Sequence, residues 1–497
     1  MSANTSSNPL NALANQPKAL RVVLLIVLCF TQFLDAFNNS SFFAAIPPIA
    51  SQLHIDNSDS VWLISAYQLT FAAFLLSSGR LSDVYNPTYV FVSGMLLMSF
   101  CSLGAGFVRT EIPLMVLRAF MGLGAALNIP SAMALVISMF PDPVPQSRAL
   151  AAFAAGAAIG NVFGLIIGAS LVTFASWPWI LYLAAILSAV IATLVLVLLP
   201  SSRVQYRSAV NQYSQFQRLD IPGIGILTVA LVLFVFAVTS GSISGWPSPR
   251  TLIPLVASGL LIVVFALWER YLPEELASVP LSIWRHPNFP ILTAIGLQPF
   301  MWWASVQLLF SWYYQEVFQW STINVAIRFL PLGLMSFPVM GIASILQQKL
   351  PFTQVILIGD VLVLVGTSLF PFADSKEQFW RFAFPGFFIG TTGMTIVFAT
   401  TNIAIFAVTP PNVAGVVGAI FMCALQLGSA AGAAIITAIQ TSVEKNHGGP
   451  TSFEGRAAGF WFLFAFNAVL TTSALILLRR MPLQSEKLHT SSKEPYS

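Results

Sequence analysis

The sequence has 497 residues, of which 57% are apolar, while 22 Lys or Arg and 18 Asp or Glu make only 8% of it charged. Soluble domains carry about 25% charged residues, so this composition excludes a water-soluble globular protein. The net charge of +4 comes from scattered Lys and Arg residues, so we expect no basic surface for nucleic acid.

Apolar runs follow one another along the chain, each close to the ~20 residues that a helix needs to cross a bilayer. Lipid offers no hydrogen bonds to the backbone, and these runs are too long for β-barrel strands, so the sequence predicts an all-α membrane protein. The expected spans lie near 20–50, 59–79, 88–108, 112–138, 147–174, 177–200, 220–240, 251–271, 289–316, 322–346, 353–372, 381–408, 413–441 and 457–480, about 14 transmembrane helices.

Lys and Arg residues near the span ends predict the orientation, because such residues stay cytoplasmic. With both termini inside, the cytoplasmic segments hold about twice as many basic residues as the outer ones. We therefore expect a multi-pass protein of the cell membrane with cytoplasmic termini, the alternative being a vacuolar or vesicular membrane.

A similar succession of sequence features occurs in the two halves of the chain. Arg118 and its following glycines precede a proline-containing turn and a glycine-rich span, and a similar order begins again at Arg381. Duplicated halves are typical of secondary transporters, the alternative being a chance match of glycine-rich spans. The expected parts are an N-terminal tail (1–19), a six-helix bundle (20–200), a cytoplasmic linker (201–219), two additional helices (220–271), a cytoplasmic loop (272–288), a second six-helix bundle (289–480) and a C-terminal tail (481–497).

Asp35 lies near the middle of the first span, where an ionised carboxylate is costly unless it is solvated or paired. Gln32, Asn38 and Asn39 share its helical face, so this face is predicted to line water or substrate. The alternative is an Asp that only hydrogen-bonds a neighbouring helix.

Arg118 is a second charge inside a span, and Gly122 and Gly124 after it allow another backbone to approach closely. A buried guanidinium needs an acceptor, and Asp35 is the candidate. The two residues are predicted to form a pair that a proton arriving at Asp35 would release.

The fifth span has glycine at every fourth position, including Gly156, Gly160 and Gly164. This spacing is typical of close helix packing. Plain packing, dimerisation and a surface that moves during transport are all open interpretations.

The ninth span carries Gln298, Trp302 and Gln307, whose amide and aromatic groups suit a drug-sized or cationic organic ligand. The twelfth span adds Thr395 and Asn402 on one helical stripe, although hydroxyls can also bond their own helix. We predict substrate binding for these five residues.

The sequence contains no phosphate-binding G-x-x-x-x-G-K-[ST] motif and no H-E-x-x-H motif. We therefore expect no enzyme, no cofactor and no metal site. Without a nucleotide site, transport would draw its energy from an ion or substrate gradient.

The segments WLISAYQLTFAAFLLSSGRLSDVY, LMVLRAFMGLGAALNIPSA and FLDAFNNSSFFAAIPPIA resemble those of the major facilitator superfamily. Within it, nearly the whole chain is similar to the fourteen-span drug:proton antiporters, especially the fungal aminotriazole-resistance-like group. Gly79, Arg80 and Asp83 match a G-x-L-x-D signature, and the resemblance implies a gating role for this loop and proton coupling for Arg118. It also implies a two-bundle fold, with the first, fourth, ninth and twelfth spans around a central cavity.

The chain departs from this pattern after Asp83, where the expected basic residues are missing, and in the fifth span, where Asn161 follows Gly160 in place of the proline of the antiporter signature. Our leading hypothesis is a monomeric, proton-coupled exporter of small organic compounds, such as drugs, toxins or secondary metabolites. The alternatives are an importer or facilitator of a small metabolite, and a transporter-like sensor that binds its ligand without moving it.

Overall fold

The computed structural model describes residues 13, 16–56, 59–199, 220–273, 276–409, 414–445 and 449–479. The expected linker 201–219, the tail 481–497 and most of the tail 1–19 lie outside these residues. In the described ranges the regular structure is helical, and 13 helices are long and apolar enough to cross a membrane. The predicted all-α fold is thus confirmed.

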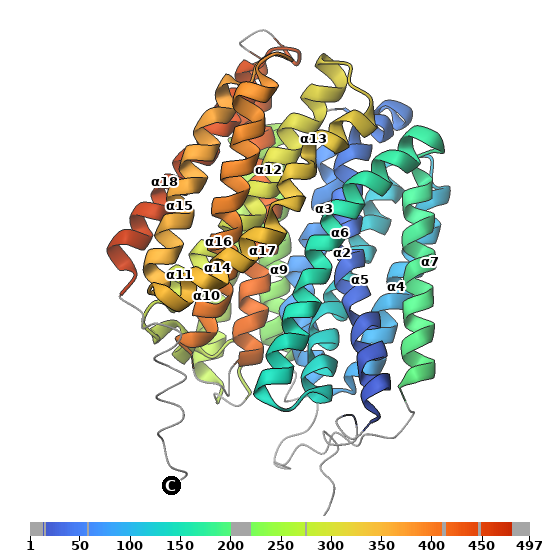
Figure 1. Cartoon of the computed structure of the whole chain (residues 1–497), viewed down its shortest axis with the longest axis vertical. Coiled ribbons are helices and arrows are strands. Elements are labelled where there is room, and N and C mark those ends of the chain that lie inside the picture. Colours follow the sequence, from blue (N-terminus) through green and yellow to red (C-terminus); the bar gives the residue numbers. More distant parts are fainter. Residues whose placement is uncertain are drawn as a thin grey trace, which may run out of the picture. The chain divides into compact units, whose positions relative to one another are not determined.

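Two compact units divide the chain. The first comprises Met1–Ile55, Ala66–Val232 and Leu260–Ser278, and the second Asp56–Ser65, Leu233–Gly259 and Val279–Ser497. The first half supplies the helices α2 (Lys18–Leu53), α3 (Trp62–Val84), α4 (Pro87–Phe107), α5 (Glu111–Met139), α6 (Pro143–Phe174) and α7 (Pro178–Leu198). The helices α9 (Ile221–Ser244) and α10 (Pro249–Tyr271) follow. In Figure 1, α4 runs between α5 and α7, both of which it contacts.

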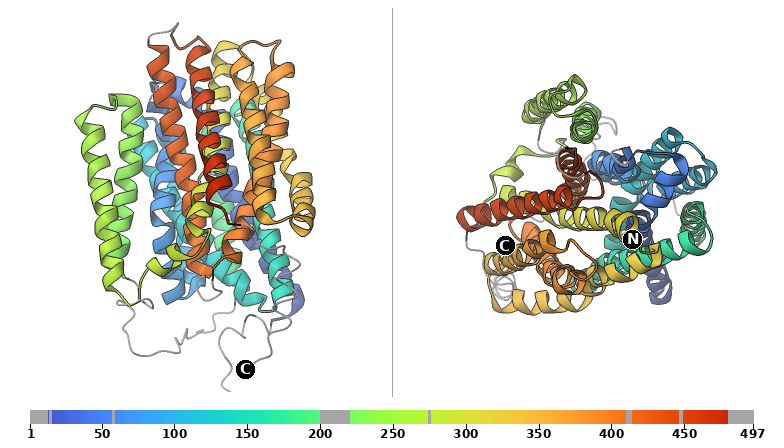
Figure 2. Two further views of the ribbon diagram at one scale, coloured as in Figure 1. Left: turned by 90° about the vertical axis from the view of Figure 1, so that its left-hand side faces the viewer. Right: turned by 90° about the horizontal axis from the view of Figure 1, so that it is seen from above.

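The second half contains more helices than the expected spans, because two of these are interrupted. Its elements are α11 (Phe289–Ile295), α12 (Gln298–Trp312), the π-helix η3 (Tyr313–Val317), α13 (Thr322–Leu334), α14 (Ser336–Lys349), α15 (Phe352–Leu369), η4 (Phe370–Phe372), η5 (Phe379–Ala383), α16 (Phe384–Ala407), α17 (Ala414–Glu444) and α18 (Glu454–Leu477). The orange and red helices α15 to α18 can be followed in Figure 2, and α18 contacts both α15 and α17.

The ninth expected span, 289–316, is not one continuous helix, which corrects the sequence-based prediction. It consists of α11, α12 and η3, because Pro299 has no N–H to donate to the carbonyl of Ile295. Pro338 likewise removes the donor to Leu334, at the break between α13 and α14 in the tenth span.

In each unit, one pair of neighbouring helices is packed closely through glycine residues. A Cβ built on Gly124 of α5 would lie 2.8 Å from the carbonyl oxygen of Gly94 in α4. In the second unit, a Cβ on Gly393 of α16 would lie 2.4 Å from the carbonyl oxygen of Gly359 in α15. The missing side chains let the two backbones of each pair touch.

Candidate functional site

Asp35 lies in the middle of α2, and its side chain is only half-buried. Its Oδ1 accepts a hydrogen bond from the hydroxyl of Tyr67 in α3, at 2.5 Å. Tyr67 is fully buried, so the phenol connects a partly accessible carboxylate to the interior of the first unit.

Arg118 in α5 is completely buried, and its contacts include an amide and two aromatic rings. Its Nη1 donates to Oδ1 of Asn38 at 2.9 Å. Its Cζ lies 3.8 Å from the centroid of the Phe42 ring and 4.9 Å from that of Tyr67. The cation–π interaction stabilises a cation most when the cation is removed from water, and Arg118 is buried.

The predicted pairing of Asp35 with Arg118 takes an indirect form in the structure. In the described part of the chain no salt bridge joins the two side chains, and Tyr67 contacts both, through its hydroxyl and its ring. The reason is the helix geometry: Asn38, almost one turn beyond Asp35, takes the acceptor position at the guanidinium. We call Asp35, Asn38, Phe42, Tyr67 and Arg118 the α2–α3–α5 cluster.

Gly122 explains how Tyr67 reaches this position. A Cβ on Gly122 would lie 2.1 Å from the carbonyl oxygen of Tyr67, so any larger residue would push α3 away from α5. The hydroxyl of Thr70 adds a hydrogen bond to the carbonyl oxygen of Ala119, at 2.6 Å. Sequence reasoning missed Tyr67, although a phenol followed by Gln68 inside an apolar span is a signal that could have found it.

The other amides predicted on the Asp35 face keep unpaired atoms. Gln32 Oε1, Asn38 Nδ2 and Asn39 Oδ1 are buried and have no hydrogen-bond partner among the described residues. Asn39 uses its other end to donate to the backbone carbonyl of Asp35, at 3.3 Å. This face of α2 therefore retains hydrogen-bonding capacity, and substrate binding by these residues stays a prediction.

The glycine ridge of the fifth span packs against α2, beside which α6 lies in Figure 1. Cβ atoms on Gly156, Gly160 and Gly164 would lie 2.5, 2.2 and 2.9 Å from the carbonyl oxygens of Cys29, Phe33 and Phe37, respectively. The ridge thus packs against α2 within the chain, and the interpretation as a surface that moves during transport stays a prediction. The contacts fix the α2 backbone while its opposite polar side carries Asp35.

In the second unit, the predicted binding residues of α12 face protein partners. Nε2 of Gln298 donates to Oδ1 of Asp360 at 3.0 Å. The indole N–H of Trp302 donates to Thr367 at 2.8 Å, and a Cβ on Gly390 would lie 2.4 Å from this indole. Trp302 is fully buried, so its contacts here are those of a packing residue.

The remaining predicted binding residues differ in their surroundings. Gln307 is buried and its Oε1 has no partner among the described residues, whereas the hydroxyl of Thr395 donates to Ser336 at 3.3 Å. Asn402 is half-buried. A substrate role for these residues, and for Gln298 and Trp302, remains a prediction.

The predicted gating residues lie at the end of α3. Arg80 donates from Nη2 to the carbonyl oxygens of Leu276, at 3.1 Å, and Ala277. It therefore ties α3 to the segment that follows α10. Gly79 is part of α3, and the side chain of Asp83 lies outside what the structure describes.

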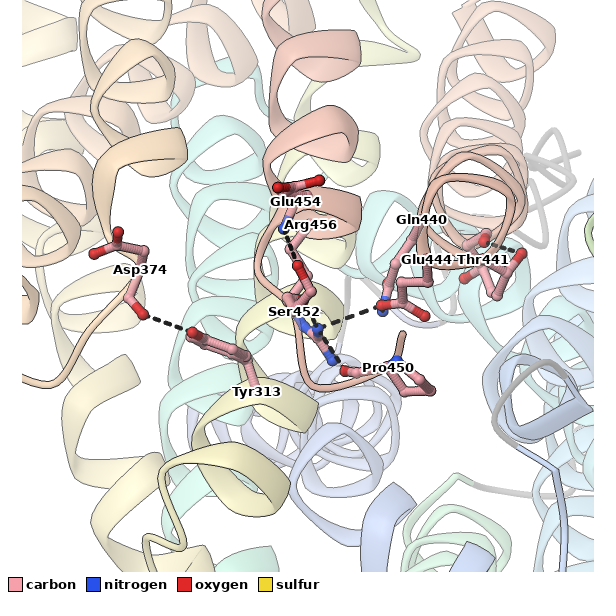
Figure 3. A network of polar contacts seen from close by, with 10 residues as sticks. Tyr313, Asp374, Gln440, Thr441, Glu444, Pro450, Ser452, Glu454 and Arg456 are labelled. Atoms are coloured by element: carbon pink, nitrogen blue, oxygen red, sulfur yellow. Dashed lines mark hydrogen bonds and ion pairs between the residues drawn. The ribbon is translucent and has the colours of Figure 1, made fainter. Parts of the chain in front are cut away.

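A polar network at the start of α18 was not expected from the sequence (Figure 3). Arg456 forms a buried ion pair with Glu444 of α17, with 3.3 Å between Nη1 and Oε1. The same Nη1 donates to the carbonyl oxygens of Pro450 and Ser452, at 2.9 and 2.8 Å, and Cζ lies 4.8 Å from the ring centroid of Tyr313. The network joins the end of α17 to residues at the start of α18.

Comparison with known proteins gives these features a context. The profile of the Major Facilitator Superfamily matches residues 28–433. A puromycin resistance protein of Streptomyces alboniger is 28% identical and covers 91% of this chain and 90% of its own length. The efflux pump terJ of Aspergillus terreus is 25% identical, covering 97% of this chain and 93% of its own.

A multidrug transporter of Aspergillus fumigatus, mfsC, is 27% identical over 92% of this chain and 86% of its own. Among solved structures, a peptide transporter in complex with sulfate superposes with a TM-score of 0.63 at 17% identity, covering 91% of this chain and 93% of its own. At that identity the structural likeness shows the fold alone.

Proposed function

Because this chain belongs to the major facilitator superfamily, as its motifs led us to expect, we propose that it is a proton-coupled exporter of small organic compounds that works by alternating access. The names of its relatives support export: they are a puromycin resistance protein, an efflux pump and a multidrug transporter. We further propose that it acts as a monomer in the cell membrane, with both termini in the cytoplasm.

The observation that carries the proposal is the position of Asp35 in the α2–α3–α5 cluster. Asp35 is half-buried and accepts a hydrogen bond from Tyr67, whose ring lies against the buried charge of Arg118. Protonation of Asp35 would remove a negative charge that acts on this cation and weaken the bond from Tyr67. Arg118 would then be free to exchange its contacts with Asn38 and the two rings, so a proton could shift the packing of three helices.

The amide atoms without partners on α2 support a polar ligand-facing surface next to this proton site. Gln32 and Asn39 each leave a buried oxygen unpaired among the described residues. Such acceptors lower the cost of holding a polar or cationic group of an otherwise apolar compound. Proton and substrate would then act on the same helix, which is what coupling requires.

The first test is an accumulation assay in cells that lack their own exporters, with puromycin and a fluorescent cationic dye as probes. We expect cells with the intact chain to accumulate less probe than vector controls, and cells with Arg118→Ala at equal expression to match the controls. Accumulation above the controls would show import. Binding of the dye by the purified protein without flux above empty vesicles would show a sensor.

The second test addresses proton coupling in vesicles with an imposed pH gradient. Asp35→Asn keeps an acceptor for Tyr67 but cannot gain or lose a proton. We expect this variant to fold, to retain substrate counterflow and to lose its response to the gradient. A variant that remains fully coupled would remove Asp35 from the mechanism.

A further inference from the structure

Asp360 lies in the middle of the 18-residue helix α15 and is completely buried. Its Oδ1 accepts a hydrogen bond of 3.0 Å from Nε2 of Gln298 in α12. Two atoms of this pair, Oδ2 of Asp360 and Oε1 of Gln298, are buried without a hydrogen-bond partner among the described residues. With an ionised Asp360 both are acceptors, so neither can satisfy the other.

The helices around Asp360 offer no cation to balance an ionised carboxylate. In the described residues, α12 and α16 contain no charged side chain, and α15 contains only Asp360. Of the other helices packed on α15, α14 carries the exposed Lys349, and α18 carries the exposed Glu454 and Arg456, which is paired with Glu444. A buried carboxylate without such a partner is strongly disfavoured.

A single proton on Asp360 would remove the uncompensated negative charge and would also allow the two unpaired oxygens to form a hydrogen bond. Bound to Oδ2, it makes Asp360 neutral and turns this oxygen into a donor, for which Oε1 of Gln298 is the available acceptor. The acid and the amide would then exchange two hydrogen bonds, from Nε2 to Oδ1 and from Oδ2 to Oε1. The proton comes from water, and no bond between heavy atoms forms or breaks.

We propose that Asp360 is a second proton-binding site of this transporter, and that in the present conformation it holds its proton in a paired arrangement with Gln298. The site lies in the second unit, whereas Asp35 lies in the first. The protonation state of Asp360 does not depend on the direction of transport. It can therefore be tested by measurements that report on the protonated acid without a transport assay.

Infrared spectra of the purified full-length chain in detergent, recorded between pH 5 and 9, test the proposal directly. The carbonyl stretch of a buried, protonated carboxylic acid is resolved from that of a carboxylate. We expect wild type to show a protonated-acid band at neutral pH that loses intensity in Asp360→Asn and keeps its full intensity in the exposed-site control Asp142→Asn. A band of undiminished intensity in Asp360→Asn would overturn the proposal. A carboxylate band that responds to sodium chloride in wild type but not in Asp360→Asn would show a cation site instead.

Thermal unfolding as a function of pH gives a second, independent readout. If the folded chain holds a proton that the unfolded chain releases at neutral pH, stability falls as pH rises. We expect Asp360→Asn, whose amide can make the same two hydrogen bonds, to fold normally and to show a smaller fall of Tm between pH 6 and 9. Gln298→Leu removes the partner in both hydrogen bonds and should therefore also change this fall. An unchanged pH dependence in both variants would contradict the proposal.

Discussion

The hydroxyl of Tyr67 donates a hydrogen bond to Asp35, so a residue that sequence reasoning overlooked holds the carboxylate of the proposed proton switch. The same phenol ring lies against Arg118. Tyr67 can therefore transmit a change at the carboxylate to the guanidinium without a direct contact between them.

Replacing Tyr67 by Phe separates these two contacts, because Phe keeps the ring beside Arg118 and loses only the hydroxyl. We expect a loss of about 1.5–3 kcal/mol in the free energy of unfolding, as for a hydrogen bond to a charged group. The larger expected effect is a shifted pH dependence of transport in vesicles. Tyr67→Leu, which removes both contacts, should abolish transport. A Phe variant with an unchanged pH profile would show that the hydroxyl has no part in coupling.

Gly122→Ala should destabilise the chain and impair transport, because its Cβ would meet the carbonyl oxygen of Tyr67 at 2.1 Å. Overpacking of this kind costs about 1–3 kcal/mol, measured by thermal unfolding in detergent. Gly259→Ala in α10 is the matched control, since a Cβ there meets nothing within 4 Å. The control should be neutral or slightly stabilising. Equal effects at both glycines would refute the argument from close approach.

Removing one side of the buried Arg456–Glu444 pair should be among the most destabilising changes outside the proposed proton sites. Arg456→Leu leaves an uncompensated carboxylate, for which about 3–5 kcal/mol is the typical loss. The double variant Arg456→Leu/Glu444→Leu should recover much of that loss in unfolding assays, whereas the exposed Lys445→Gln should have little effect. A double variant as unstable as the single one would mean that the bonds to Pro450 and Ser452 dominate.

Arg80→Gln should loosen the segment after α10, because its two backbone acceptors, Leu276 and Ala277, lose a charged donor. Hydrogen–deuterium exchange of peptides covering 276–280 should become faster, while peptides from α4 remain unchanged. Unchanged exchange in 276–280 would show that Arg80 does not hold this segment.

The sequence by itself determined the class of protein and most of the helices. Long apolar runs can be accommodated only as membrane helices, and the motifs around Arg80, Arg118 and Asp35 indicated the family that the comparison confirmed. Single charges inside such runs also marked Asp35 and Arg118 in advance, since burial makes them costly wherever they point.

Only the tertiary structure decided which groups meet. It showed that Tyr67 contacts both Asp35 and Arg118. It showed that the guanidinium of Arg118 contacts Asn38 and Phe42. It also showed that Gln298 donates a hydrogen bond to Asp360. These partners come from different helices, and periodicity along one helix says which face is polar but not what lies opposite it. Partner choice depends on how closely two backbones approach, and glycine contacts such as Gly122 on Tyr67 set that distance.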